Sequence, residues 1–236
     1  MAGNSWIIFD ADNTLWDVES LYDRARTEFC QLLFSALEEG NHNSKGYVTI
    51  DLIERAQRHR DLQLYASLGY SSGRFAKSFE DTLSFFMPAG DRMLMERATQ
   101  IALGVFDGAP TISDGLESLL AHLKQTFQLG IITAGDPSVQ KKRLENFRLR
   151  DRFDAIEIVD KKTAGVFQAF CQKHGVDPRS SWVVGDSIRS DILPAREAGL
   201  RAIHLKAANW DAEHDMAPSD LISIDRLSQI LAVVLG

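Results

Sequence analysis

A short apolar run stands alone near the start of the chain, and it constrains the fold more than any other feature. Residues 6–9 (WIIF) form a continuous apolar stretch typical of a strand buried on both faces of a sheet. The next such run comes only after Gly108. Between them, apolar residues recur at the spacing of amphipathic helices, in 21–37, 50–68 and 94–105. The sequence therefore predicts one strand followed by an all-helical block.

Beyond Gly108 the chain alternates helical patterns with short apolar runs, an order typical of a parallel sheet wrapped by helices. We predict strands here at 128–133, 153–159, 181–186 and 201–205. The first strand belongs with these, so the predicted fold class is α/β: a Rossmann-like doubly wound parallel sheet core with an inserted all-helical domain. The core is expected to comprise residues 1–17 plus 107–236, and the insertion residues 18–106, placed to cover the active face.

Composition and charge narrow the class of protein. The chain has 236 residues, of which 44% are apolar and 25% charged, as in ordinary globular proteins. Its net charge of -7 argues against nucleic acid as a partner. Neither an export signal nor a long apolar span is evident, so we expect a cytoplasmic protein without membrane contact. Cys30 and Cys171 lack metal-type spacing and are assigned to packing. The sequence does not determine whether the protein is a monomer or a homodimer.

Polar side chains follow four of the predicted strands, at the point where each strand ends. In an open parallel sheet, ligands bind outside the carboxyl ends of the strands, near the point where strand order reverses. We therefore expect these side chains to form one site. They are Asp10 and Asp12, Thr133, Lys161 and Lys162, and Asp186 with Asp191.

This set of side chains suits a phosphate ester. A carboxylate such as Asp10 can attack phosphorus, and Asp12, two residues on, can donate a proton to the leaving oxygen and later activate water. Mg²⁺ prefers one or two carboxylates together with phosphate oxygens, and Asp10 and Asp186 would supply the carboxylates. Thr133 can hydrogen-bond a phosphoryl oxygen, while a lysine ammonium offsets negative charge in the transition state.

The motifs "DADNTL", "IITAG", the lysine pair and "VVGDSIRSDILPAREAG" together resemble the four ordered motifs of the haloacid dehalogenase-like (HAD) hydrolase superfamily. Its first motif is D-x-D-x-T and its fourth G-D-x-x-x-x-D. The resemblance covers residues 6–17 and about 108–205, and the place of the insertion resembles the C1 class, in which a helical cap closes over the active site.

Carried over by position, the resemblance implies a role for each matching residue. Asp10 would be the nucleophile, and Asp12 the general acid/base, whose backbone carbonyl also binds the metal. Thr133 would be a phosphoryl ligand and Asp186 a magnesium ligand. Asp191 would bind the metal through water or position the lysine.

Two departures from the family pattern leave choices open. The family presents its catalytic lysine in two forms, and the segment "DKKTAGVF" lacks the prolines of the K-P-D-P form. The spacing of that form would select Lys161, whereas the shorter K-T-x-x-x-[YF] form selects Lys162. We favour Lys162, with Thr163 capping the helix that follows. Position 134 is Ala where many members have Asn. Ala134 and Gly135 are nevertheless predicted to contact substrate.

The expected function is Mg²⁺-dependent hydrolysis of a small phosphorylated metabolite through an aspartyl-phosphate intermediate. A 2-haloacid dehalogenase is disfavoured by Asp12, because relatives with that activity lack the second Asp. A phosphomutase and an inactive phospho-binding regulatory protein stay open, while the order of motifs disfavours a signalling receiver. Which phosphorylated substrate is used does not follow from the sequence.

Two further segments are interpreted from their charge. In the insertion, "LGYSSGRFAKS" is either a substrate-selecting segment, with Arg74 pairing to an anionic group, or a solvent-facing loop. The run "QKKRLENFRLRDRF" is interpreted as a solvated helix face with charges of both signs.

Overall fold

The computed structural model describes residues 5–40, 46–69, 71–206 and 218–236. The chain divides into two units, Met1–Val18 with Pro110–Gly236 and Glu19–Ala109, against predicted borders after residues 17 and 106. No helix among the described residues has both the length and the apolar character needed to cross a membrane.

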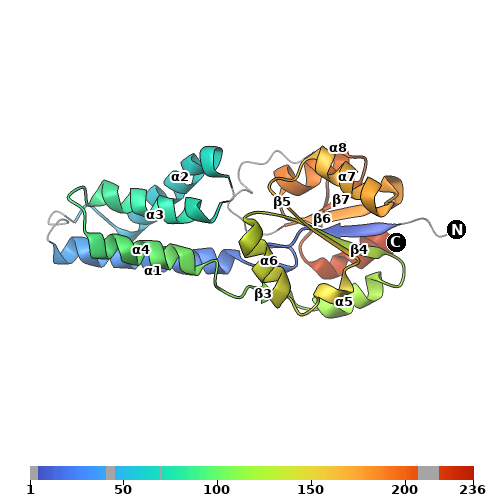
Figure 1. Cartoon of the computed structure of the whole chain (residues 1–236), viewed down its shortest axis with the longest axis horizontal. Coiled ribbons are helices and arrows are strands. Elements are labelled where there is room, and N and C mark those ends of the chain that lie inside the picture. The colour runs from blue at the N-terminus through green and yellow to red at the C-terminus, as the bar shows by residue number, and fades with distance from the viewer. Residues whose placement is uncertain (1–4, 41–45, 70, 207–217) are drawn as a thin grey trace. The chain divides into compact units, whose positions relative to one another are not determined.

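Within the part of the chain that the structure describes, the first unit is built on a six-stranded sheet in which every pairing is parallel (Figure 1). The strand order is β5-β4-β1-β6-β7-β8. The bounds are β1 Trp6–Phe9, β4 Gln128–Ala134, β5 Ala155–Val159, β6 Trp182–Gly185, β7 Arg201–Leu205 and β8 Ile222–Ile224. The chain adds β4 and β5 on one side of β1, then returns to add β6, β7 and β8 on the other. Strand order therefore reverses at β1.

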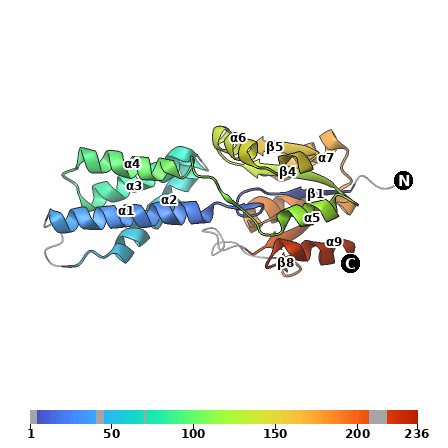
Figure 2. The same cartoon turned by 90° about the horizontal axis from the view of Figure 1, so that it is seen from below.

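Helices cover both faces of this sheet. Helices α7 and α8 lie on one face, and α5 and α9 on the other (Figures 1 and 2). The bounds are α5 Leu116–Leu123, α6 Pro137–Asn146, α7 Ala164–His174, α8 Leu193–Glu197 and α9 Ile230–Leu235. Short 3-10 turns span Arg150–Arg152, Pro178–Ser180 and Leu227–Gln229, and a π-helical turn spans Ile188–Ile192.

All four residues of β1 are buried, as expected for a central strand covered on both faces. Trp6 and Ile8 pack with Phe170 of α7 and Val183 of β6 in one apolar cluster. Burying such side chains stabilises the fold by roughly 1.5–3 kcal/mol each. The predicted α/β class with a doubly wound parallel sheet is confirmed.

A small antiparallel pair of strands brings together the two segments through which the chain leaves and re-enters the first unit. Strand β2 (Trp16–Asp17) pairs with β3 (Thr111–Ile112). The Ser113 hydroxyl donates to the backbone oxygen of Thr14 at 3.1 Å, which fastens the same junction. These two-residue strands are too short to show an apolar pattern, and the sequence did not predict them.

In its described residues the second unit, taken by itself, is a bundle of four helices around one apolar core. They are α1 Glu19–Glu39, α2 Ile50–Leu68, α3 Ser72–Phe86 and α4 Arg92–Gly104. Phe29 of α1 and Phe79 of α3 stack with ring centroids 4.1 Å apart at its centre. Helix α3 begins inside the segment interpreted as selecting substrate or as a loop, so the part from Ser72 onward is helix; Tyr70 lies outside the described residues. Cys30 and Cys171 are buried free thiols in the two cores.

Candidate active site

Asp10 lies directly after β1, at the point where strand order reverses. Its backbone N–H donates to Val184 O of β6 at 2.8 Å, and the residue is 7% exposed. Because β1 is the central strand, side chains at the ends of β4 and β6 lie on either side of Asp10. The carboxylate therefore occupies the ligand-binding position of an open parallel sheet.

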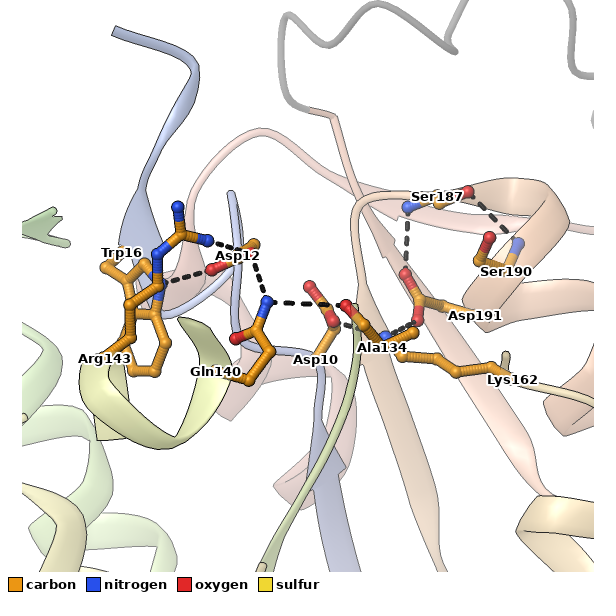
Figure 3. A network of polar contacts seen from close by, with 10 residues as sticks. All are labelled: Asp10, Asp12, Trp16, Ala134, Gln140, Arg143, Lys162, Ser187, Ser190 and Asp191. Atoms are coloured by element: carbon orange, nitrogen blue, oxygen red, sulfur yellow. Dashed lines mark hydrogen bonds and ion pairs between the residues drawn. The ribbon is translucent and has the colours of Figure 1, made fainter. Parts of the chain in front are cut away.

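The Lys162 ammonium joins Asp10 to Asp191 (Figure 3). It donates to Oδ1 of Asp10 and, at 2.5 Å, to Oδ1 of Asp191, and all three residues are buried. Lys162 follows β5 and precedes α7, whose first turn is capped by the Thr163 hydroxyl, which accepts from Val166 N at 3.3 Å. Lys161 is exposed. Of the two lysines left open by the sequence, only Lys162 contacts Asp10 in the structure.

Asp191 reaches this position because Gly185 has no side chain. A Cβ atom at Gly185 would lie 2.3 Å from Cγ of Asp191, which no packing tolerates. Asp191 sits in the π-helical turn, a feature that often marks functional sites, and its Oδ2 accepts from Ser187 N at 3.1 Å. The glycine and the final aspartate of G-D-x-x-x-x-D are thus physically linked.

Charge in this cluster is unevenly balanced. Burial raises the pKa of Asp10 from 3.8 to about 7; Lys162 opposes the shift, and the negative charge of Asp191 reinforces it. Burial alone would lower the pKa of Lys162, but Asp10 and Asp191 outweigh it, so the pKa of Lys162 is raised. The lysine stays positively charged, and the carboxylates around it carry more negative charge than one ammonium offsets.

Three of the carboxylates are placed to hold a cation together. Oxygen atoms of Asp10, Asp186 and Asp191 lie within 4.8 Å of one another, and all three residues are buried. His204 of β7 contacts the Asp186 backbone oxygen through Nε2 at 3.0 Å, which ties that residue to the sheet. A set made only of carboxylate oxygens, with an excess of negative charge, fits a hard divalent cation such as Mg²⁺.

Thr133 and Ala134 end β4 at the same edge of the sheet, and Gly135 follows them. The register places Ile131 opposite Phe9, so Thr133 lies just beyond the level of Asp10 and is 1% exposed. Gly135 has φ of 146°, a conformation that favours glycine, and its missing Cβ leaves room for the Gln140 side chain. Their expected contacts with substrate stay predictions.

Asp12 has partners different from those of Asp10. Its Oδ1 accepts from Trp16 Nε1 at 2.6 Å, and its Oδ2 accepts from Gln140 Nε2 at 2.8 Å and Arg143 Nη1 at 2.6 Å. Figure 3 shows this group on one side of Asp10, with Lys162 and Asp191 on the other. The carboxylate of Asp12 thus points toward α6.

The interpretation of "QKKRLENFRLRDRF" as a solvated helix face is wrong for its inner residues. Gln140 and Arg143 are 3% and 5% exposed, respectively, although Lys141 and Lys142 are exposed. Together with Leu144, which is also buried, the first two form an i, i+3, i+4 stripe on α6. Such a stripe predicts a buried helix face, but the charged residues around it made this pattern hard to detect in the sequence.

Arg74 lies in the second unit, where it is 7% exposed. It forms an ion pair with Asp61 of α2 at 2.9 Å and donates to Gly69 O at 3.1 Å. These contacts fasten the start of α3 to the end of α2. A role for Arg74 toward substrate stays a prediction.

Comparison with known proteins identifies the family. The family model for haloacid dehalogenase-like hydrolases matches residues 5–199, so the chain belongs to this family of hydrolases, as its motifs predicted. The pyrimidine 5'-nucleotidase YjjG of Escherichia coli is 27% identical over 238 residues, which cover 96% of this chain and 97% of that protein. The N-acylneuraminate-9-phosphatase of Rattus norvegicus is 24% identical over 203 residues, covering 83% and 79%.

Solved structures show the same fold. A haloacid dehalogenase-like family hydrolase from Xanthomonas campestris matches with a TM-score of 0.78 at 21% identity, covering 99% of this chain and 91% of that one. A 2-haloacid dehalogenase from Pseudomonas syringae matches with a TM-score of 0.57 at 23% identity, covering 98% of both chains. This likeness shows the fold alone, and the fold does not identify the reaction.

Proposed function

We propose that the protein is a Mg²⁺-dependent phosphatase that hydrolyses a small phosphorylated metabolite through an aspartyl-phosphate on Asp10. The observation that carries the proposal is the arrangement around Asp10: a buried carboxylate at the switch point of the sheet, joined to Lys162 and flanked by Asp186 and Asp191. The phosphatase relatives support the same reaction class.

In the first half of the reaction an oxygen of Asp10 attacks phosphorus. The phosphorus–oxygen bond to the leaving group breaks, and the leaving oxygen takes a proton from Asp12. In the second half Asp12 accepts a proton from water as the water oxygen attacks phosphorus. The bond from phosphorus to Asp10 then breaks, which releases inorganic phosphate and returns Asp10 to its carboxylate form and Asp12 to the protonated form in which it began.

The remaining groups stabilise charge. Lys162 holds Asp10 in place and offsets negative charge on the phosphoryl oxygens, and Thr133 donates a hydrogen bond to one of them. Asp10, the backbone oxygen of Asp12 and Asp186 would hold Mg²⁺, with Asp191 binding through water. The cation, when bound, offsets the excess negative charge of the carboxylates and of the substrate phosphate.

Asp12 separates this proposal from haloacid dehalogenation on the same fold. Expulsion of halide needs no proton, so an acid two residues after the nucleophile has no use there. An alkoxide leaving group is a strong base and does need one. Asp12 therefore favours the phosphatase.

The test is phosphate release from a panel that includes N-acylneuraminate 9-phosphate, pyrimidine nucleoside 5'-monophosphates, glyceraldehyde 3-phosphate and p-nitrophenyl phosphate. Wild type and Asp10→Asn are assayed side by side, each with Mg²⁺ and with EDTA. We expect release only by wild type with Mg²⁺. Turnover of haloacids without metal, or release that survives Asp10→Asn, contradicts the proposal.

A further inference from the structure

The Asp12 carboxylate is held unevenly by its three donors. Each oxygen of a carboxylate has about two acceptor sites. Oδ2 accepts from both Gln140 and Arg143, so its two sites are filled, whereas among the described residues Oδ1 accepts only from Trp16. The second acceptor site of Oδ1 has no partner among the described residues, and the Asp12 side chain is 24% exposed, so this site can serve a reacting group.

Among the residues that the structure describes, Arg143 contacts only the Asp12 carboxylate through its guanidinium. Its side chain is 4% exposed, Nη1 bonds Asp12, and among the described residues Nε and Nη2 have no hydrogen-bond partner although both atoms are buried. Burying a guanidinium with so few partners is unfavourable, so its presence is not explained by stability. Because the unpaired nitrogens are out of reach of solvent, they are also out of reach of substrate. Arg143 therefore acts through Asp12.

The surrounding structure holds Arg143 and Gln140 in place. Asp136 caps α6 by accepting from Ser138 N at 2.9 Å, and Pro137 opens the helix. A Cβ at Gly135 would lie 3.0 Å from Gln140 Nε2, so this glycine allows the amide to approach Asp12.

Trp16 is held from the other side. Its ring packs edge-on against Phe147, with centroids 4.8 Å apart, and Trp16 is 1% exposed. The three donors to Asp12 among the described residues thus come from packed parts of the first unit.

We propose that Arg143 is a positioning residue. Together with Gln140 it occupies Oδ2 of Asp12 with hydrogen bonds, so that Oδ1 is the oxygen that transfers the proton. This inference rests on the proposed phosphatase reaction. It adds that the geometry of the acid/base is set within the first unit by α6. Without Arg143 the carboxylate turns, and Oδ1 no longer meets the leaving oxygen.

The test uses leaving groups of different basicity. Departure of an alkoxide requires a proton from Asp12, whereas p-nitrophenolate is a weak base that leaves with little help. We expect Arg143→Met to lower kcat/KM about 100-fold for the best alkyl phosphate, and less than about fivefold for p-nitrophenyl phosphate. Lys141→Met, which removes an exposed charge from the same helix, should change neither value.

Asp12→Asn supplies the reference pattern. It should show the same dependence on the leaving group, and adding Arg143→Met to it should lower kcat/KM no further, because both changes remove one function. Equal losses for both leaving groups, or additive losses in the double variant, would mean that Arg143 only supports the fold and would overturn the proposal. If Arg143→Met does not fold, Arg143→Lys keeps the charge and should show a smaller loss of the same kind.

A second readout does not depend on turnover. The Trp16 indole N–H donates to Oδ1 of Asp12, so its NMR resonance reports the orientation of the carboxylate. It is identified among the four tryptophans by its disappearance in Trp16→Phe. We expect Arg143→Met to move it in the same direction as Asp12→Asn. An unmoved resonance refutes positioning, whereas a wild type inactive on every ester refutes only the phosphatase.

Discussion

Lys161 and Lys162 are neighbours in sequence but differ in environment, so replacing each by methionine tests the site with a matched control. The Lys162 side chain is 4% exposed and contacts Asp10 and Asp191, whereas Lys161 is exposed. Methionine keeps most of the length and apolar volume of lysine and removes the charge. Any difference between the two variants therefore reports the buried ammonium.

The expected size of the effect follows from the contacts. Lys162→Met leaves two buried carboxylates without their cation, and removing one partner of a buried ion pair costs about 3–5 kcal/mol. Without the metal, the pKa of Asp10, already about 7, loses the influence of Lys162 that lowers it, so in EDTA at pH 7 the carboxyl group becomes mostly protonated. With the loss of transition-state stabilisation, we expect kcat to fall about 10²–10³-fold. Lys161→Met should change the free energy of unfolding by less than about 0.5 kcal/mol.

The assays are urea unfolding in EDTA at pH 7 and phosphate release with Mg²⁺. Adding Asp191→Asn to Lys162→Met removes one of the two uncompensated carboxylates, so the double variant should regain part of the stability but none of the activity. Similar losses in Lys161→Met and Lys162→Met would refute the reasoning, because they would show that burial beside Asp10 does not distinguish the two lysines.

Three further predictions concern the same cluster. Gly185→Ala should destabilise the protein by about 1–3 kcal/mol and reduce kcat, because its Cβ would collide with Asp191. Gly165→Ala is the control: the atom nearest to its Cβ is 3.8 Å away, so the free energy of unfolding and kcat should stay near wild type. In EDTA, the raised pKa of Asp10 means that the folded state binds more protons than the unfolded state between pH 4 and 7. The free energy of unfolding of wild type should therefore fall by about 4 kcal/mol, relative to that of Asp10→Asn, as the pH rises over this range. If the two proteins lose stability equally with pH, the pKa of Asp10 is not raised. Mg²⁺ should raise the Tm of wild type, and Asp186→Asn should reduce that shift; an equal shift in both would place the cation elsewhere.

The sheet and its polar edge could be predicted because they depend on local pattern. Four of the five predicted strands begin and end within one residue of the observed bounds, since buried parallel strands appear as short apolar runs. The exception is 153–159, where Phe153 and Asp154 precede β5. The edge strand β8 was not predicted; two of its three residues are exposed, so it lacks such a run.

The partners of Asp12 could not be predicted in the same way. Gln140 and Arg143 are separated from Asp12 by 128 and 131 positions in the chain, so their contact depends on the packing of α6 beside the β1 end. A charged residue in a charged segment is most often solvated, and that general expectation was wrong here. The contact of Lys162 with Asp10, in contrast, agrees with the preference drawn from Thr163, whose capping position fixes where α7 begins.

The turn after β1 explains how two carboxylates two residues apart acquire separate surroundings. In a straight strand Asp10 and Asp12 would point to the same face. Here Asn13 adopts φ of 60°, and Ala11 O accepts from Leu15 N at 2.8 Å, so the chain curls as soon as the strand ends. Asp10 is left facing Lys162 in the buried acidic cluster, while Asp12 is turned toward α6, where it is partly exposed. Different environments for paired carboxylates are what allow one to act as nucleophile and the other as acid/base. If the turn is the cause, Asn13→Val, which disfavours positive φ, should impair proton transfer to an alkoxide leaving group more than binding of Mg²⁺.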